Sequence, residues 1–323
     1  MNGKEWFKQA RFGMMVHFGL YSILGGEWRG RRMGQGDIGE WIQAQFRIPN
    51  AEYHQLRRVF NPICFSAREW VDLAKEAGMQ YIVVTSKHHE GFALFDSEYD
   101  SFNSVKGTPF GRDIIEELAE ECYRQGLRLG LYYSQDIDWS HPDGGGYDAT
   151  VPHVSAGTWC NDWDYPDASK KDYTRLFETK IKTQMKEILT KYGDLCLVWC
   201  DTPMSISREQ SEELLRMIKH YQPDCLVNSR IGNGMGDYCS WGDNQIPDER
   251  MVEGLFETPA TLNDTWGYKS YDCNWKSAEQ VLAIKRHLNE RGINYLLNVG
   301  PDHLGRIPAP SVDILRTVGR MDK

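Results

Sequence analysis

The sequence predicts an irregular (β/α)8 barrel. Short apolar segments that end at breakers alternate with amphipathic segments of helical period along the chain, and polar residues follow several of the apolar segments. Such alternation gives a parallel sheet with crossover helices. About seven strands in 323 residues fit a barrel better than a doubly wound sheet, because no Gly-x-Gly-x-x-Gly or phosphate-binding loop follows a strand.

The predicted strands are short runs of apolar, β-branched and aromatic residues. The clearest one is Asp-Leu-Cys-Leu-Val-Trp-Cys-Asp at 194–201, which ends at the breaker Thr202-Pro203. The whole predicted set is 13–19, 81–86, 128–133, 194–201, 225–231, 255–258 and 294–300.

The helices are predicted from their start and stop signals. Ser66, Ser207 and Ser277 are each followed three residues later by Glu or Gln, which is the capping-box pattern. Two further helices are predicted from about 111 to 126 and from about 171 to 192, and 135–167 is predicted as a long loop. Because no linker or repeat divides the chain, we expect one catalytic barrel domain over 1–323.

Composition restricts the class of partner. The formal net charge of −9 argues against a nucleic-acid or anionic-membrane partner, and no apolar run approaches membrane length. The eight cysteines are scattered and no signal peptide begins the chain, so we expect a cytoplasmic protein. The sequence leaves open whether it is a homo-oligomer. Eleven Trp and sixteen Tyr are typical of carbohydrate sites, where rings stack on sugars, but also of plain cores.

Polar side chains converge on one predicted face of the barrel, at the carboxyl ends of five strands: His17, His88, His89, Tyr133, Asp201 and Arg230. Active sites of such barrels lie at that face. Each residue also has a structural alternative, because a histidine there is often an ordinary hydrogen-bonded group, Arg230 could be a surface cation and Asp201 an N-cap. Neighbouring strand residues face opposite ways, so His88 and His89 are poor joint ligands for a metal and suit a polyhydroxylated ligand better.

The ordered set of motifs resembles the retaining α-L-fucosidases of glycoside hydrolase family 29. The resemblance covers nearly the whole chain through Gly-Met-Met-Val-His-Phe-Gly at 13–19, Lys-His-His-Glu-Gly-Phe at 87–92, Leu-Tyr-Tyr-Ser at 131–134, Val-Trp-Cys-Asp at 198–201, Asn-Ser-Arg at 228–230, Asn-Asp-Thr-Trp-Gly-Tyr at 263–268 and Asn-Tyr-Leu-Leu-Asn-Val-Gly-Pro at 294–301. Many members continue into a C-terminal β-sandwich, which we do not expect here. The chain is similar to the short bacterial members, some of which prefer α-1,6-linked fucose.

The resemblance implies roles for individual residues. Asp201 is expected to be the nucleophile. The expected fucose-binding set is His17, Glu40, Trp41, His88, His89, Tyr133, Arg230 and Trp266. Two acid/base candidates stay open: Asp243 is favoured, because a loop carboxylate can approach the leaving oxygen from the side opposite Asp201, and Glu257 is the alternative.

Two departures from the family pattern matter. Many members have Trp-Phe-Asp-Gly at the nucleophile, whereas this chain has Trp199-Cys200-Asp201-Thr202. Cys200 is expected to point away from the side of Asp201. An Asp at position 243 is one methylene shorter than the Glu of many members, so its loop must lie closer to the substrate.

We therefore predict a retaining exo-α-L-fucosidase that needs no metal or organic cofactor and whose partner is a fucosylated glycan. Two alternative functions stay open. One is a metal-dependent sugar isomerase or hydrolase that uses His17, His88 and a carboxylate. The other is a non-catalytic sugar-binding relative, against which the presence of both Asp201 and an acid candidate argues.

Overall fold

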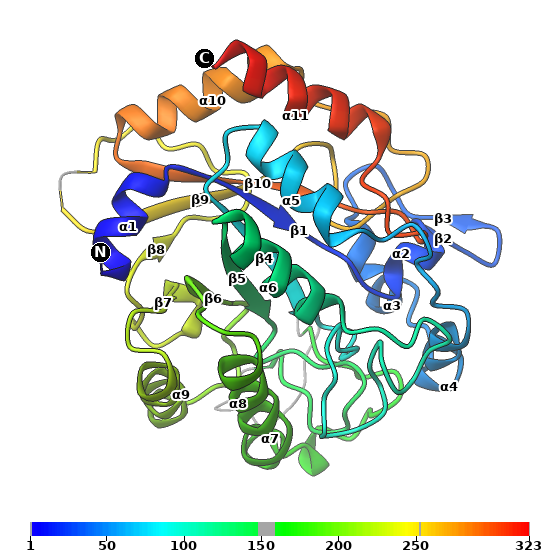
Figure 1. Cartoon of the computed structure of the whole chain (residues 1–323). Helices are drawn as coiled ribbons and strands as arrows, with labels where there is room; N and C mark the ends of the chain where they lie inside the picture. The colour runs from blue at the N-terminus through cyan, green and yellow to red at the C-terminus, as the bar shows by residue number, and fades with distance from the viewer. Residues whose placement is uncertain (1, 148–158, 252, 323) are drawn as a thin grey trace.

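The computed structural model describes residues 2–147, 159–251 and 253–322. Within them, eight parallel strands form a curled sheet in the order β7-β6-β5-β4-β1-β10-β9-β8, surrounded by helices (Figure 1). The strands are β1 Phe12–Val16, β4 Tyr81–Lys87, β5 Arg128–Tyr133, β6 Leu197–Cys200, β7 Leu226–Val227, β8 Cys239–Ser240, β9 Phe256–Thr261 and β10 Ile293–Val299. A separate antiparallel pair joins β2 Glu27–Trp28 and β3 Arg31–Arg32.

The two edge strands of the sheet meet and close the barrel. A parallel bridge joins Asn228, just after β7, to Tyr238, just before β8. The backbone N–H of Asp237 also donates to the carbonyl oxygen of Val227 at 2.6 Å. The predicted (β/α)8 barrel is thereby confirmed, and the described residues contain no β-sandwich.

The helices that pack around the barrel begin where the capping signals place them. Ser207 and Ser277 form full capping boxes at α9 Arg208–Tyr221 and α10 Ala278–Glu290, and Ser66 accepts the N–H of Glu69 at the start of α5. The other helices of the outer layer are α5 Ala67–Glu76, α6 Ile114–Gln125, α8 Lys182–Lys191 and α11 Ala309–Met321 (Figure 1).

Several boundaries differ from the sequence prediction. The predicted helix at 171–192 is divided into α7 Tyr173–Leu176, a π-helical turn Phe177–Ile181 and α8. The predicted strand at 225–231 ends after two residues and turns into the 3-10 helix Ser229–Ile231. Strand β8 and helices α1 and α11 were not predicted; a two-residue strand carries no periodic signal. Of the predicted loop at 135–167, residues 148–158 lie outside the described residues.

Side chains of the strands alternate between two cores. Met15, Tyr81, Tyr132 and Trp199 face the barrel interior, whereas their neighbours in sequence pack outward against the helices. Helix α1, Gly3–Ala10, covers the amino ends of the strands. Its Phe7 ring lies 4.6 Å from that of Tyr238, and its Trp6 ring lies 5.6 Å from that of Tyr81. The carboxyl ends are therefore the open end of the barrel.

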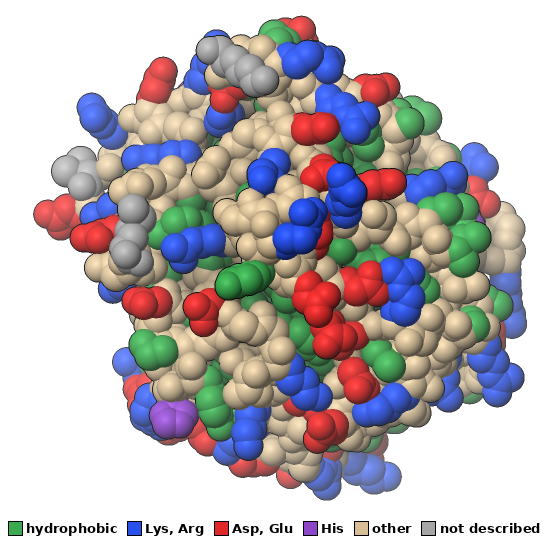
Figure 2. Space-filling model, in the orientation of Figure 1, with side chains coloured by type: hydrophobic (Ala, Val, Ile, Leu, Met, Phe, Trp, Pro, Cys, Tyr) green, Lys and Arg blue, Asp and Glu red, His purple; other side chains and the backbone are tan. Residues whose placement is uncertain are grey.

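The distribution of charged side chains on the surface is consistent with the net charge of −9. On the face shown in Figure 2, acidic and basic side chains are interspersed, so this face offers no extended basic surface of the kind that nucleic acid requires. None of the described helices is long and apolar enough to cross a membrane.

Candidate active site

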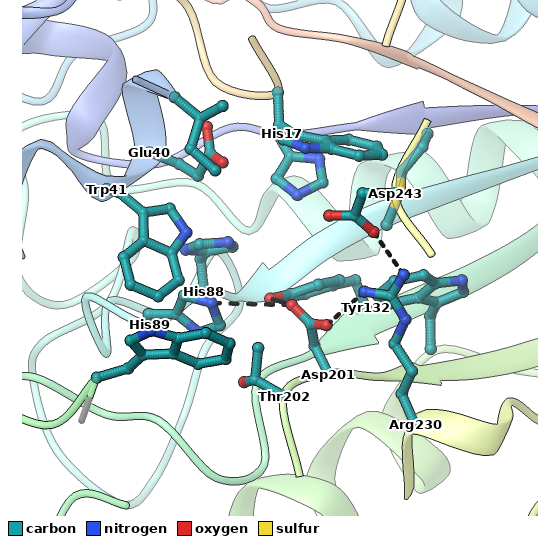
Figure 3. A pocket seen from close by; sticks show the side chains of 15 residues that line it. His17, Glu40, Trp41, His88, His89, Tyr132, Asp201, Thr202, Arg230 and Asp243 are labelled. Carbon is teal, nitrogen blue, oxygen red and sulfur yellow. Dashed lines mark hydrogen bonds and ion pairs between the residues drawn. The ribbon is translucent and has the colours of Figure 1, made fainter. Parts of the chain in front are cut away.

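A pocket with a volume of about 190 Å³ opens at the carboxyl ends of the strands (Figure 3). Side chains from six strand ends and from the loops after β1 and β9 converge there, as expected for such a barrel. Its lining consists of Met15, His17, Ile38, Glu40, Trp41, His88, His89, Tyr132, Trp159, Trp199, Asp201, Thr202, Arg230, Asp243 and Trp266.

Asp201 follows β6 and lies on the wall of this pocket with 8 % of its surface exposed. One carboxylate oxygen accepts the hydroxyl of Tyr132 at 2.7 Å, and the other contacts Nη1 of Arg230 at 3.0 Å. Nε2 of His89 lies 3.8 Å from Oδ2. The carboxylate is thus held in one orientation by groups from three different strands, which suits a nucleophile.

Arg230 links the two carboxylates of the pocket. Its Nη2 contacts Asp243 Oδ1 at 2.5 Å and donates to the carbonyl oxygen of Trp241 at 3.0 Å, while Nη1 contacts Asp201. The guanidinium lies 4.6 Å from the centre of the Trp199 ring. Its pKa is raised above the usual range by Asp201 and Asp243, although burial opposes the shift. Figure 3 shows the resulting chain from Asp201 through Arg230 to Asp243.

Gln135, which follows β5, ties the backbones of these two residues together. Its side-chain oxygen accepts the N–H of Asp201 at 2.7 Å, and its side-chain nitrogen donates to the carbonyl oxygen of Arg230 at 2.9 Å. The side chain is fully buried. Gln135 is therefore a positioning residue for both the carboxylate and the cation that holds it.

Replacing Gln135 by leucine is expected to lower kcat by about tenfold to a hundredfold, with a smaller change in KM, because small displacements of reacting groups cost this much. Gln135→Glu keeps the acceptor for Asp201 but loses the donor to Arg230, so its kcat should be intermediate. Steady-state kinetics test both variants. Gln80→Leu, at the exposed amino end of β4, is the control. Wild-type kinetics in a folded Gln135→Leu protein would contradict the positioning role.

Two histidines present a neutral ring nitrogen to the pocket. Asn298 donates its amide to the Trp266 carbonyl oxygen, so its own oxygen accepts Nδ1–H of His17 at 2.7 Å. Ser134 donates to the Ile137 carbonyl oxygen and accepts Nδ1–H of His89 at 2.7 Å. Burial lowers the pKa of His17 to about 4 and that of His89 well below its usual range. In both rings Nε2 is left as an acceptor for ligand hydroxyls.

Glu40 and the aromatic rings complete the pocket. Glu40 accepts the N–H of Gly267 at 2.7 Å, and burial raises its pKa to about 8, so at neutral pH it carries a proton and can donate to a ligand. The Trp41 ring packs at 5.2 Å from that of His89, and the Trp266 ring at 5.3 Å from that of His17. The structure thus brings all predicted binding residues into one pocket except Tyr133.

The placement predicted for Tyr133 is wrong. Its hydroxyl donates to the side-chain oxygen of Gln184 at 2.8 Å on helix α8, and its ring packs in the outer core. Tyr132 lies in the pocket instead, because residues alternate across a strand and Tyr132 is in register with Trp199, two residues before Asp201. The pairing of Tyr133 with the outward-facing Cys200 places it on the helix side, and this strand parity was the signal that sequence reasoning missed.

The prediction that His88 and His89 face opposite ways is also wrong, because the two residues do not lie in a strand. Both side chains line the pocket, and their ring centres are 4.1 Å apart. Strand β4 ends at Lys87 with a register irregularity, and Gly91, whose φ is +80°, closes a turn by donating its N–H to the carbonyl oxygen of His88. Alternation does not apply in a turn, so both rings reach the same side.

The two acid/base candidates lie in different places. Asp243 lines the pocket, and 46 % of its side chain is exposed. Glu257 is fully buried in the barrel, where it accepts the Tyr81 hydroxyl at 2.9 Å and the Trp199 indole N–H at 2.8 Å. Burial raises the pKa of Glu257 to about 7. Trp199 lines the pocket and Glu257 does not, so this geometry favours Asp243.

The departure at position 202 has a structural consequence. Thr202 has a φ of +47°, in the left-handed region that favours glycine and strains a β-branched residue. The Cys200 side chain packs in the outer core, away from Asp201, as expected. Thr202 thus brings a side chain into the pocket at a strained position.

The family profile described as Alpha-L-fucosidase matches residues 1–321. The chain belongs to this family. Its members are glycoside hydrolases, and the described barrel with two pocket carboxylates agrees with that class.

Solved structures extend the comparison. The α-L-fucosidase AlfC from Lactobacillus casei in complex with its α-L-fucose product is 48 % identical, with a TM-score of 0.92 over 99 % of this chain and 98 % of that one. The complex of AlfC with Fucα(1,6)GlcNAc is 49 % identical, with a TM-score of 0.91 over 98 % of each chain.

Curated relatives are more distant and longer. The α-L-fucosidase of Dictyostelium discoideum is 28 % identical over 97 % of this chain and 68 % of its own length. The human plasma α-L-fucosidase is 27 % identical over 97 % of this chain and 66 % of its own. The chain therefore spans about two thirds of the length of the curated relatives that it matches.

Proposed function

We propose that this protein is a retaining exo-α-L-fucosidase that removes terminal α-L-fucose, α-1,6-linked in its best substrates. The observation that carries the proposal is the pair Asp201 and Asp243, held by one guanidinium on the wall of a pocket of monosaccharide size. The similarity to a fucosidase crystallised with Fucα(1,6)GlcNAc supports the substrate and the linkage.

The reaction would proceed in two displacements. A carboxylate oxygen of Asp201 attacks the anomeric carbon, the glycosidic C–O bond breaks, and Asp243 gives its proton to the leaving oxygen. Asp243 then takes a proton from water, whose oxygen attacks the same carbon and frees Asp201. The neutral His17 and His89 accept hydrogen bonds from sugar hydroxyls at Nε2, and the protonated Glu40 donates a hydrogen bond to another hydroxyl oxygen of the sugar.

A panel of fucosylated disaccharides that differ in linkage tests this function, with released fucose as the readout. Fucα(1,6)GlcNAc should have the highest kcat/KM. Proton NMR of the first turnovers should show α-L-fucose before mutarotation, because two inversions restore the configuration. Initial release of the β-anomer would contradict a retaining mechanism, and no fucose from any substrate would contradict the function itself.

Activity is expected to be independent of divalent metals. The described residues contain no group of three or more His, Cys, Asp or Glu that could hold a metal ion, and Nδ1 of both His17 and His89 is already hydrogen-bonded. Overnight dialysis against a chelator should leave kcat/KM unchanged. Loss of activity that one added divalent cation restores would instead support the metal-dependent isomerase or hydrolase. A cytoplasmic location remains our prediction from the scattered cysteines, and cell fractionation tests it.

A further inference from the structure

A carboxyl group lies in the barrel interior, and neither displacement of the proposed reaction uses it. It belongs to Glu257 on β9, which is fully buried and does not line the pocket. Barrel interiors are usually filled with branched apolar side chains. A buried carboxyl group also costs free energy unless its oxygens are hydrogen-bonded. Packing alone therefore does not explain a glutamate at this position, and its partners indicate what the carboxyl group does.

One donor contacts each oxygen of this carboxyl group. Oε1 of Glu257 accepts the indole N–H of Trp199 at 2.8 Å, and Oε2 contacts the hydroxyl of Tyr81 at 2.9 Å. Burial raises the pKa of Glu257 to about 7, so the ionised and the protonated form are both present near neutral pH. Because an indole N–H can only donate, Glu257 accepts from Trp199 in either form. The hydrogen bond that orients the Trp199 ring is thus present across this pH range.

Trp199 connects this buried hydrogen bond to the pocket. It lies on β6 two residues before Asp201, and its ring lines the pocket. The Tyr132 ring is stacked on it, with the ring centres 5.5 Å apart and an angle of 18° between the planes. The guanidinium of Arg230 lies 4.6 Å from its centre. Ring stacking and cation–π contacts both depend on the orientation of the ring, so a rotation of Trp199 would disturb both neighbours at once.

Tyr132 and Arg230 are the two groups that hold the carboxylate of Asp201. The Tyr132 hydroxyl donates to one oxygen at 2.7 Å, and Nη1 of Arg230 contacts the other at 3.0 Å. A continuous series of contacts therefore leads from Glu257 through the Trp199 ring to both oxygens of Asp201.

We propose that Glu257 is a positioning residue, which fixes the Trp199 ring and, through that ring, the orientation of the Asp201 carboxylate. The inference rests on the proposed fucosidase function and gives Glu257 a role other than proton transfer to the substrate. Loss of this role should lower kcat for good and poor leaving groups alike, because Glu257 gives no proton. KM should change little, since a displaced reacting group affects the chemical step.

A double-mutant cycle on an aryl fucoside tests whether Glu257 acts through the indole N–H. Glu257→Leu removes the acceptor, and Trp199→Phe removes the donor but keeps an aromatic ring. Each is expected to lower kcat by about tenfold to a hundredfold. Adding Glu257→Leu to Trp199→Phe should lower kcat by no more than about threefold further, because the interaction is already lost. Effects that multiply in the double variant would overturn the proposal.

Two further variants separate positioning from a general loss of stability. Glu257→Gln keeps an acceptor for the indole N–H, so its kcat should stay within about threefold of the wild-type value. Trp70→Phe is the matched control, because Trp70 is also buried and its indole N–H donates to the carbonyl oxygen of Gly305 at 3.1 Å, on the helix layer. This control should have wild-type kcat.

Trp199→Phe keeps the test decisive if Glu257→Leu does not fold. Wild-type kcat in folded Trp199→Phe would overturn the positioning role and leave the fucosidase function intact. A wild-type protein that releases no fucose from the aryl fucoside or from any disaccharide would overturn the fucosidase proposal and the positioning role with it.

Discussion

Asp201→Gly is expected to lower kcat by at least about a thousandfold while the protein stays folded, because a nucleophile that acts as part of a unit contributes this much or more. The carboxylate accepts the Tyr132 hydroxyl and contacts Arg230, yet Arg230 keeps Asp243 and the Trp241 carbonyl oxygen as partners in the variant. The fold should therefore tolerate the change. Turnover of an aryl fucoside measures the loss, and circular dichroism with a thermal melt confirms folding.

Added azide provides a second test of this prediction. In Asp201→Gly, azide can occupy the space of the lost carboxylate and attack the anomeric carbon once, which gives the inverted β-fucosyl azide. Asp194→Asn, an exposed carboxylate before the amino end of β6, is the matched control and should be as active as the wild type. Near-normal turnover by folded Asp201→Gly would show that the nucleophile is another residue.

The second large effect is expected at the acid/base. Asp243→Ala should lower kcat/KM for Fucα(1,6)GlcNAc by about a hundredfold or more, but should lower it much less for an aryl fucoside with a good leaving group, because such a group departs without a proton. Azide should raise kcat of the aryl substrate, since it attacks the intermediate without a base. The product should be the α-fucosyl azide, with retained configuration.

Glu257→Gln is the comparison variant, because glutamine can still accept one of the two hydrogen bonds from Tyr81 and Trp199 in the barrel interior. Glu257→Gln should lower kcat/KM for both substrates to a similar extent, smaller than in Asp243→Ala, and azide should not raise its kcat. If Glu257→Gln shows the leaving-group dependence and Asp243→Ala does not, the two roles are reversed. If neither does, Glu40 becomes the candidate, because it lines the pocket and burial raises its pKa to about 8.

Local patterns predicted the parts of this protein that depend on near neighbours in sequence. The apolar run before Asp201, the serine caps at Ser207 and Ser277, and the polar residues after each strand all depend on a few consecutive residues. The rule that parallel strands present their carboxyl ends at one edge was then enough to collect His17, Asp201 and Arg230 in one pocket.

Packing between distant segments decided which side chains face the pocket. Tyr132 rather than Tyr133 points inward because β5 is in register with β6, and His88 and His89 share one side because Gly91 turns the chain after β4. Gln135 positions the site because its side-chain amide binds backbone groups of both Asp201 and Arg230, which are far from it in sequence. Such contacts depend on strand register and turn geometry, which are set by the whole barrel and not by any local run of residues.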